Sequence, residues 1–242
     1  ELRHLRLVRS VADAGSLTLL YEGSGGVEAE RFDPKGKSVW RLGEPVDRME
    51  MNVMKFGSAP LASPMVLAQD GGVFRIVEGV YALNRLSATG GNEGSWTRPF
   101  ERVKFEMPKP SGDDGEEGHQ MVFVTVEDDG GGDGPEVSWG DKDSGKEISL
   151  DADDLKKMMP EFRTDLRGVL AWPDGRLWAI TSREDDGRVT VDEWSGNGEY
   201  LRRLSVPRYD WYAVGKDGNL YGVSHDDDDY PIVHRFNVTS NL

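Results

Sequence analysis

Short apolar runs follow glycine-containing turns along the chain, with polar residues between them. The stretches GSLTLLYEG, GGVFRIVEG, GRLWAITSR and GNLYGVSHD begin at Gly15, Gly71, Gly175 and Gly218. In each, apolar side chains alternate with polar ones or run together briefly, which is typical of a β-strand that leaves a tight turn. The pattern predicts four such strands.

A second glycine turn follows in the first three copies. An apolar residue lies four positions before the turn glycine in each, and these pairs are Phe32 and Gly36, Leu86 and Gly90, and Trp194 and Gly198. The predicted unit is therefore strand, turn, strand, loop, strand, turn, strand.

The spacing of the units indicates the fold class. The first-turn glycines are 56, 104 and 43 residues apart, and the longest gap has room for a degenerate fifth unit. Four short strands in about 40 to 50 residues are typical of a propeller blade. We predict an all-β, β-propeller-like array of four-stranded antiparallel blades, with four or five units visible and the array incomplete or shortened. A β-sandwich or a meander is the alternative.

Blades cover one another's faces, which explains continuous apolar runs such as SPMVLA and GVLAW. The last unit lacks a fourth strand, and LRHLRLVRSVA near the N-terminus has the alternation to supply it. We expect residues 1–242 to form a single propeller-like domain, in which an open array would expose two ends.

An acidic insert is predicted at 106–160. Residues 112–154 contain 15 Asp and Glu against 2 Lys, and the whole chain carries a formal charge of −15. MVFVTV at 121–126 predicts a strand, and LKKMMPEF at 155–162 predicts a short helix with aspartates near its start. The insert is either a solvated hairpin or an arm that docks on a basic partner surface. The candidate docking residues are Asp113, Asp114, Glu116 and Glu117.

Composition excludes several classes of site. The chain has no cysteine, so disulfides and thiolate chemistry are ruled out. No basic surface is indicated, so nucleic acid is not an expected partner, and no apolar run is long enough for a transmembrane segment. The four histidines have no metal-ligand spacing, and serine-hydrolase and zinc-protease motifs are missing.

Calcium is the one metal that the sequence leaves open. The candidate ligands are Asp128, Asp129 and Asp133. Their spacing departs from the pattern of an EF-hand loop. We therefore expect no cofactor, with calcium at this cluster as the alternative. The run HDDDDY is expected to be a solvated loop tip, since four adjacent like charges repel one another.

PRYDWYAV contains the strongest candidate interface. Arg208, Tyr209, Trp211 and Tyr212 crowd a segment between two units. Arginine and aromatic side chains often anchor interfaces. Packing beneath a loop is the other interpretation of this cluster.

The order of these segments resembles a family. AQDGGVFRIVEGVYALNRLSATGG, then LAWPDGRLWAI, VDEWSGNGEYLRRLSVP and GKDGNLYGV are similar to the bacterial six-bladed β-propellers related to NHL repeats. The resemblance covers roughly 63–238 and implies an exported or periplasmic protein. Six blades require more strands than this chain shows.

Three functional hypotheses from different classes follow. The first is a non-catalytic protein-interaction or scaffold module, such as an accessory subunit of a larger membrane-associated assembly, whose partner is another protein or a multi-subunit complex. The alternative is a calcium-dependent propeller hydrolase or lactonase, and a sensor ectodomain is a third option. An enzyme requires carboxylates from several blades to converge on one pocket, whereas a scaffold requires an exposed contact face.

Overall fold

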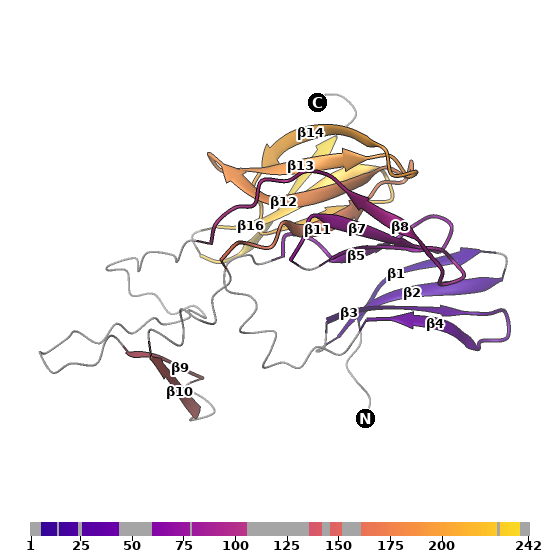
Figure 1. The fold of residues 1–242 in the computed structure, drawn as a ribbon, viewed down its shortest axis with the longest axis horizontal. Helices are drawn as coiled ribbons and strands as arrows, with labels where there is room; N and C mark the ends of the chain where they lie inside the picture. The colour runs from indigo at the N-terminus through magenta and orange to yellow at the C-terminus, as the bar shows by residue number, and fades with distance from the viewer. Residues whose placement is uncertain are drawn as a thin grey trace, which may run out of the picture. The chain divides into compact units, whose positions relative to one another are not determined.

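The structure, a computed structural model, is all-β and its sheets stack in a propeller arrangement (Figure 1). It describes residues 6–13, 15–23, 26–43, 60–77, 79–105, 136–141, 146–151, 161–226 and 228–237. Two compact units are distinguished, Glu1–Val103 with Phe162–Leu242, and Lys104–Glu161. The first unit contains all the propeller sheets.

Each sheet is a consecutive antiparallel meander. The first contains β1 (Arg6–Asp13), β2 (Ser16–Gly23), β3 (Gly26–Phe32) and β4 (Ser38–Leu42). The second contains β5 (Met65–Leu67), β6 (Val73–Ile76), β7 (Ala82–Leu86) and β8 (Asn92–Thr97). The third contains β11 (Leu166–Ala171), β12 (Leu177–Asp185), β13 (Arg188–Trp194) and β14 (Tyr200–Pro207). The fourth contains β15 (Trp211–Val214), β16 (Asn219–His225) and β17 (Pro231–Asn237).

The turn glycines occupy the conformation that the repeat requires. At the first turn, Gly15, Gly71, Gly175 and Gly218 have φ between 72° and 89°, and the second-turn glycines Gly36, Gly90 and Gly198 have φ of 78°, 85° and 88°. In six of these turns the glycine N–H donates to the carbonyl three residues before it. This is a turn closed by a residue in the left-handed region, where glycine is not strained.

The aspartate run forms the same turn without a glycine. The Asp229 N–H donates to the Asp226 carbonyl at 3.0 Å, and Asp229 has φ of 61°. The Asp226 carboxylate accepts hydrogen bonds from the backbone N–H groups of Asp228 and Tyr230. The run therefore forms the exposed turn between β16 and β17, as a loop tip requires.

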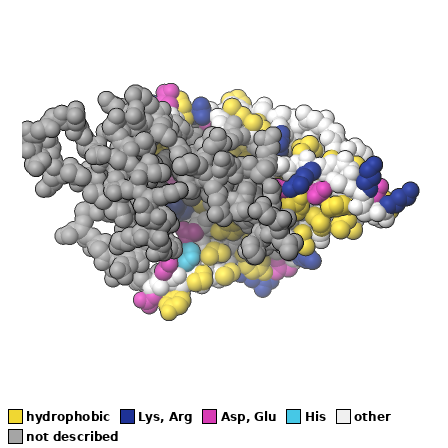
Figure 2. All heavy atoms as spheres, turned by 90° about the horizontal axis from the view of Figure 1, so that it is seen from below, with side chains coloured by type: hydrophobic (Ala, Val, Ile, Leu, Met, Phe, Trp, Pro, Cys, Tyr) yellow, Lys and Arg dark blue, Asp and Glu magenta, His cyan; other side chains and the backbone are white. Residues whose placement is uncertain are grey.

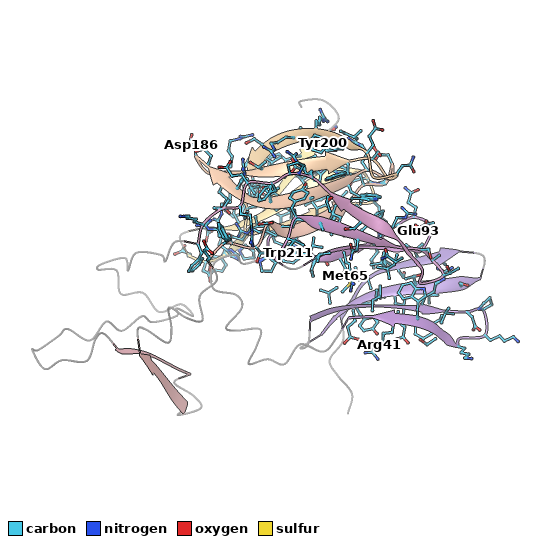
Figure 3. All side chains as sticks on the ribbon, in the orientation of Figure 1. Arg41, Met65, Glu93, Asp186, Tyr200 and Trp211 are labelled. Carbon is cyan, nitrogen blue, oxygen red and sulfur yellow. The ribbon has the colours of Figure 1, made fainter. Side chains whose placement is uncertain are left out.

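Three apolar clusters join the sheets in chain order. Leu20, Leu67 and Val73 pack between the first and second sheets, where Figure 3 also places Met65. Phe74, Leu177 and Trp194 are among the residues that join the second sheet to the third, and Trp178, Tyr212 and Leu220 are among those that join the third to the fourth. Strand β11 is buried on both faces, which explains its continuous apolar sequence.

Residues 60–63 lie between the inner strands of the third and fourth sheets. The Leu61 N–H donates to the Arg167 carbonyl at 2.8 Å, and the Leu61 carbonyl accepts from the Tyr212 N–H at 2.7 Å. At Gly168 an added Cβ would lie 2.7 Å from atoms of Ala62, so only glycine allows this approach. The segment before β5 therefore ties the second sheet to the third and the fourth.

One predicted strand pairing is wrong. The N-terminal strand does not complete the last sheet, because β1 pairs with β2 from Arg6↔Glu22 to Asp13↔Ser16. A tight turn at Gly15 makes this local pairing available, so β1 is the first strand of the first sheet. The fourth sheet has three strands among the described residues.

The second unit contains a two-stranded antiparallel sheet of β9 (Glu136–Asp141) and β10 (Lys146–Asp151). Between β8 and β11, this hairpin is the only sheet among the described residues, so a fifth four-stranded blade is not seen there. The predicted strand at 121–126 and nearly all of the predicted helix at 155–162 lie outside the described residues.

Candidate functional site

One position in the repeat shows which sheet faces are covered. Two residues after the first-turn glycine, each sheet has an apolar residue that points toward the preceding sheet. Val73, Leu177 and Leu220 are 0%, 1% and 3% exposed at this position, whereas Leu17 in the first sheet is 37% exposed. The first sheet therefore has an apolar face that no described sheet covers.

This outer face of the first sheet consists of Leu7, Leu17, Leu19 and Phe32 with the polar Tyr21, Glu28, Glu30 and Arg41. Leu7 is 59% exposed on this face, whereas Tyr21 and Glu28 are buried, with 8% and 4% exposed. Figure 2 shows the molecule from below and has hydrophobic side chains among charged ones on the described part of that surface. Tyr21 donates to Glu30, and burial together with the Glu30 charge raises the pKa of Tyr21 to about 12.

The fourth sheet presents the opposite end of the stack. Trp211, Val223 and Val233 lie opposite one another on β15, β16 and β17, so they form one row across the sheet. Trp211 is 37% exposed and Val233 is 64% exposed. The outer face of the fourth sheet consists of this row with Ala213, Tyr221 and Arg235, while Tyr212 and Leu220 point inward.

An ion pair in the fourth sheet repeats one in the second. Arg235 pairs with Asp217 at 3.1 Å, and at the equivalent positions Arg85 pairs with Asp70 at 2.5 Å. Hydrogen bonds from the Asn219 side chain and backbone lower the pKa of the Asp217 carboxyl. In the second sheet, Arg85 also donates to the Gly196 carbonyl of the third sheet at 3.3 Å.

The four predicted interface residues of PRYDWYAV have different surroundings. Trp211 is on the exposed row, and Arg208 pairs with Glu184 at 3.4 Å. Tyr209 lies over Gly222 and stacks on His234 at 4.8 Å. Tyr212 is 2% exposed in the core, and its hydroxyl donates to the Pro207 carbonyl. A direct contact with a partner would therefore involve Trp211 and Arg208, with Tyr209 and Tyr212 supporting the segment from beneath.

The acidic candidates lie outside the described residues. These are Asp113, Asp114, Glu116 and Glu117 for docking, and Asp128, Asp129 and Asp133 for calcium. Within the described part of the chain, no three His, Asp or Glu side chains are grouped so that they could hold a metal ion. The calcium site and the acidic docking arm remain predictions.

Two buried carboxylates on β13 have their hydrogen-bonding capacity used within the fold. Asp192 accepts from Tyr81 at 2.8 Å, Arg98 at 2.9 Å and Arg203 at 3.1 Å, and Glu193 is bound by Arg176, Trp178 and Arg202. Burial opposes ionisation of Glu193, but hydrogen bonds from Arg202 and Trp178 leave its pKa below the ordinary value. These groups join sheets and strands, and neither carboxylate is poised for acid–base chemistry.

Two hollows lie beside the first turns. The larger, of about 370 Å³, is lined by Trp172, Asp174, Arg176, Asp217 and Arg235 among others. Asp174 pairs with Arg176 at 2.7 Å, so each carboxylate here already has a guanidinium partner. The Trp172 indole N–H is buried without a hydrogen-bond partner among the described residues. The hollow does not bring unpaired carboxylates from several blades together, as the enzyme alternative requires.

No protein-family model and no curated protein matches the sequence. Solved structures are similar at low identity. A Bacteroides caccae protein of unknown function is 10% identical with a TM-score of 0.39, over 99% of this chain and 59% of that one. Regucalcin, a calcium-binding protein from Agrobacterium tumefaciens, is 17% identical with a TM-score of 0.33, over 93% of this chain and 54% of that one. Virginiamycin B lyase from Staphylococcus aureus is 11% identical with a TM-score of 0.31, over 95% of this chain and 69% of that one.

The chain thus spans little more than half the length of the first two of these proteins. At such TM-scores, the similarity carries no argument about what this chain binds or catalyses. Its propeller arrangement is shown by its own sheets, turns and apolar clusters. Among the described residues, no helix is long and apolar enough to cross a membrane.

Sequence reasoning identified Trp211 but missed Val233, Arg235 and Leu17. The signal was present in the repeat. Leu17 follows its turn glycine at the same distance as Val73 and Leu177, and Arg235 matches Arg85. A comparison of the repeat copies, position by position, identifies the residues that face a neighbouring sheet. Which sheets lie at the ends, with one face uncovered by another described sheet, follows only from the order of stacking.

Proposed function

We propose that this chain is a non-catalytic protein-interaction module that binds another protein through the outer face of its fourth sheet. The row of Trp211, Val223 and Val233 carries the proposal, with Trp211 and Val233 exposed at its ends and Val223 half-buried between them. Equivalent apolar faces elsewhere in the stack are buried between sheets. A contiguous apolar face with a charged residue at its border is typical of a protein contact surface.

The chemistry of this face limits the kind of partner. Trp211 supplies a large aromatic side chain, and the guanidinium of Arg235, 62% exposed, can donate further hydrogen bonds beside it. A matching surface presents apolar side chains with acceptor oxygens at its border. An acidic insert on the same chain would add a contact with a basic surface, as its composition predicts. Membership of a membrane-associated assembly and export are parts of the proposal that the resemblance alone suggests.

The proposal can be tested on protein purified gently from its source. We expect elution in a complex of fixed stoichiometry, with a second chain identified by mass spectrometry. Val233→Asp should release that chain, because it places a charge in the apolar row. Val80→Asp is the matched control, since Val80 is 50% exposed and lies outside both end faces. A complex that survives Val233→Asp, or a chain that never associates, would refute the assigned surface.

No observation on the described residues favours a calcium-dependent hydrolase. The aspartates predicted as calcium ligands lie outside the described residues. The 370 Å³ hollow lacks the unpaired acidic groups that would motivate a second candidate function.

A further inference from the structure

The second turns of the second and third sheets each receive a side-chain donor from the preceding sheet, from a different strand in the two cases. Trp40 Nε1 donates to the Ala88 carbonyl at 2.9 Å, and Arg85 Nη1 donates to the Gly196 carbonyl at 3.3 Å. Ala88 and Gly196 both lie two residues before their turn glycine. In both turns, the carbonyl two residues before the turn glycine accepts a hydrogen bond from the preceding sheet.

A tryptophan accompanies each of these hydrogen bonds. A Cβ built on Gly90 would lie 2.8 Å from Trp40, and one on Gly198 would lie 2.5 Å from Trp96. Both indoles therefore lie directly on the second-turn glycine of the following sheet. Gly90 and Gly198 are half-buried by these contacts, whereas Gly36 is exposed.

The first sheet has the receiving half of this contact, and no described residue occupies it. Gly36 is its second-turn glycine, and no described residue lies within 4 Å of a Cβ built there. Pro34 is the counterpart of Ala88 and Gly196. Leu17, which matches the buried Val73 and Leu177, is exposed beside this turn. The outer face of the first sheet is thus organised like the two receiving faces that are covered.

The fourth sheet has a counterpart of the Arg85 donor, although it has no described fourth strand to carry a tryptophan like Trp40 or Trp96. Arg235 matches Arg85 and keeps the same intra-sheet ion pair, to Asp217 instead of Asp70. In the second sheet, that pairing leaves Arg85 Nη1 free to reach the following sheet. In the fourth sheet, no described sheet follows, and Val233 stands exposed beside Arg235 on the same face.

We propose that the partner is a second copy of this chain, whose fourth sheet docks on the outer face of the first sheet, head to tail. This deepens the proposed function and depends on the same surface. Arg235 matches the donor and Pro34 matches the acceptor residue of the contact between Arg85 and Gly196, so two copies can exchange this contact reciprocally. The described propeller sheets of two copies number eight, which is within the range of four to eight blades of closed propellers. A head-to-tail contact ends in a closed assembly when its rotation closes, and a reciprocal pair closes it at two copies.

The test is the mass of the purified chain in solution, measured by sedimentation. We expect a dimer of twice the 26.9 kDa chain mass. Leu17→Asp and Val233→Asp should each weaken self-association about tenfold or more, since each places a charge in both copies of the contact. Val80→Asp should leave the dimer intact. Leu7→Asp, on a side chain 59% exposed on the same outer face, replaces Leu17→Asp if that variant folds poorly.

Mixing the variants tests the direction of docking. The Val233→Asp chain keeps an intact first sheet, and the Leu17→Asp chain keeps an intact fourth sheet, so a mixture regains one of the two contacts. We therefore expect heterodimers in the mixture that neither variant forms alone. A Leu17→Asp chain that remains fully dimeric would show that the fourth sheets pair with each other, and would overturn the proposal.

A wild-type chain that stays monomeric up to about 100 μM would also overturn it, because an interface of standard size binds more tightly than this. If that monomer still formed a Val233-dependent complex with a different protein, the interaction function would stand and only the identity of the partner would be wrong. The two failures can therefore be told apart.

Discussion

At the scale of single residues, turn glycines differ in whether another side chain packs against the position where a Cβ would lie. Gly198 and Gly175 have nearly the same φ, 88° and 89°, but only Gly198 has Trp96 against it. We expect Gly175→Ala to cost about 1 kcal/mol of unfolding free energy from backbone strain. Gly198→Ala should cost clearly more, because Trp96 must also move. Urea unfolding of both variants measures the difference, and equal losses would contradict the packing role of Trp96.

The opposite change is expected at Asp229. It has φ of 61°, where the equivalent turns have glycine. Asp229→Gly should raise the free energy of unfolding by about 0.5–1 kcal/mol, since strain and one of several crowded negative charges are removed together. Asp228→Gly removes the same charge without a positive φ, and thermal unfolding should show no such gain for it.

Buried tyrosines make stability sensitive to high pH. Burial is the main reason that the pKa of Tyr212 is raised to about 12 from an ordinary value of 10. A raised pKa stabilises the fold fully below pH 10, and this contribution is lost as pH rises from 10 through 12. The slope is about 1.4 kcal/mol per pH unit for one proton. Tyr212→Phe should flatten the fall in unfolding free energy between pH 9.5 and 11.5, whereas Tyr230→Phe, at an exposed position, should not.

At the scale of elements, β13 holds the second and third sheets together through charge. Asp192 is fully buried and accepts from Tyr81 and Arg98, which flank β7 and β8 of the second sheet, and from Arg203 of its own sheet. Asp192→Asn should cost about 3–5 kcal/mol, because two guanidinium groups lose their counter-charge in a partly buried site. Urea unfolding checks the size. Asp185→Asn at the exposed end of β12 is the control, with no comparable loss expected.

These elements also show what the sequence could predict. Turn glycines and alternating strands are local signals, so the four units, their second turns and the buried runs of β5 and β11 were predictable. The count of strands favours pairing of β1 with the last sheet, whereas the tight turn at Gly15 favours its pairing with β2, which the structure shows. Asp192 and Glu193 resembled surface charges in the sequence. Their burial depends on arginines from distant strands, which no local pattern reveals.

At the scale of the whole molecule, stability should follow the order of stacking. In a repeat array, each unit is stabilised by its neighbours, so the end units have one interface and the central units have two. Amides of β12 and β13 in the third sheet are expected to exchange hydrogen only through nearly global unfolding. Amides of β2 and β16, in the two end sheets, should exchange through smaller openings. Hydrogen exchange at dilute protein concentration would show this gradient.

Hydrogen exchange measured at several protein concentrations also tests whether the end sheets are covered by a second copy. If the end sheets cover one another in a second copy, protection of β2 and β16 should rise with protein concentration, while protection of β12 should change little. Val233→Asp should abolish this concentration dependence and leave the gradient of the monomer. End sheets that are as protected as the third sheet at every concentration, in the variant as well, would mean that their faces are already covered within one chain. Such a result would contradict both the open stack and the docking of a partner on it.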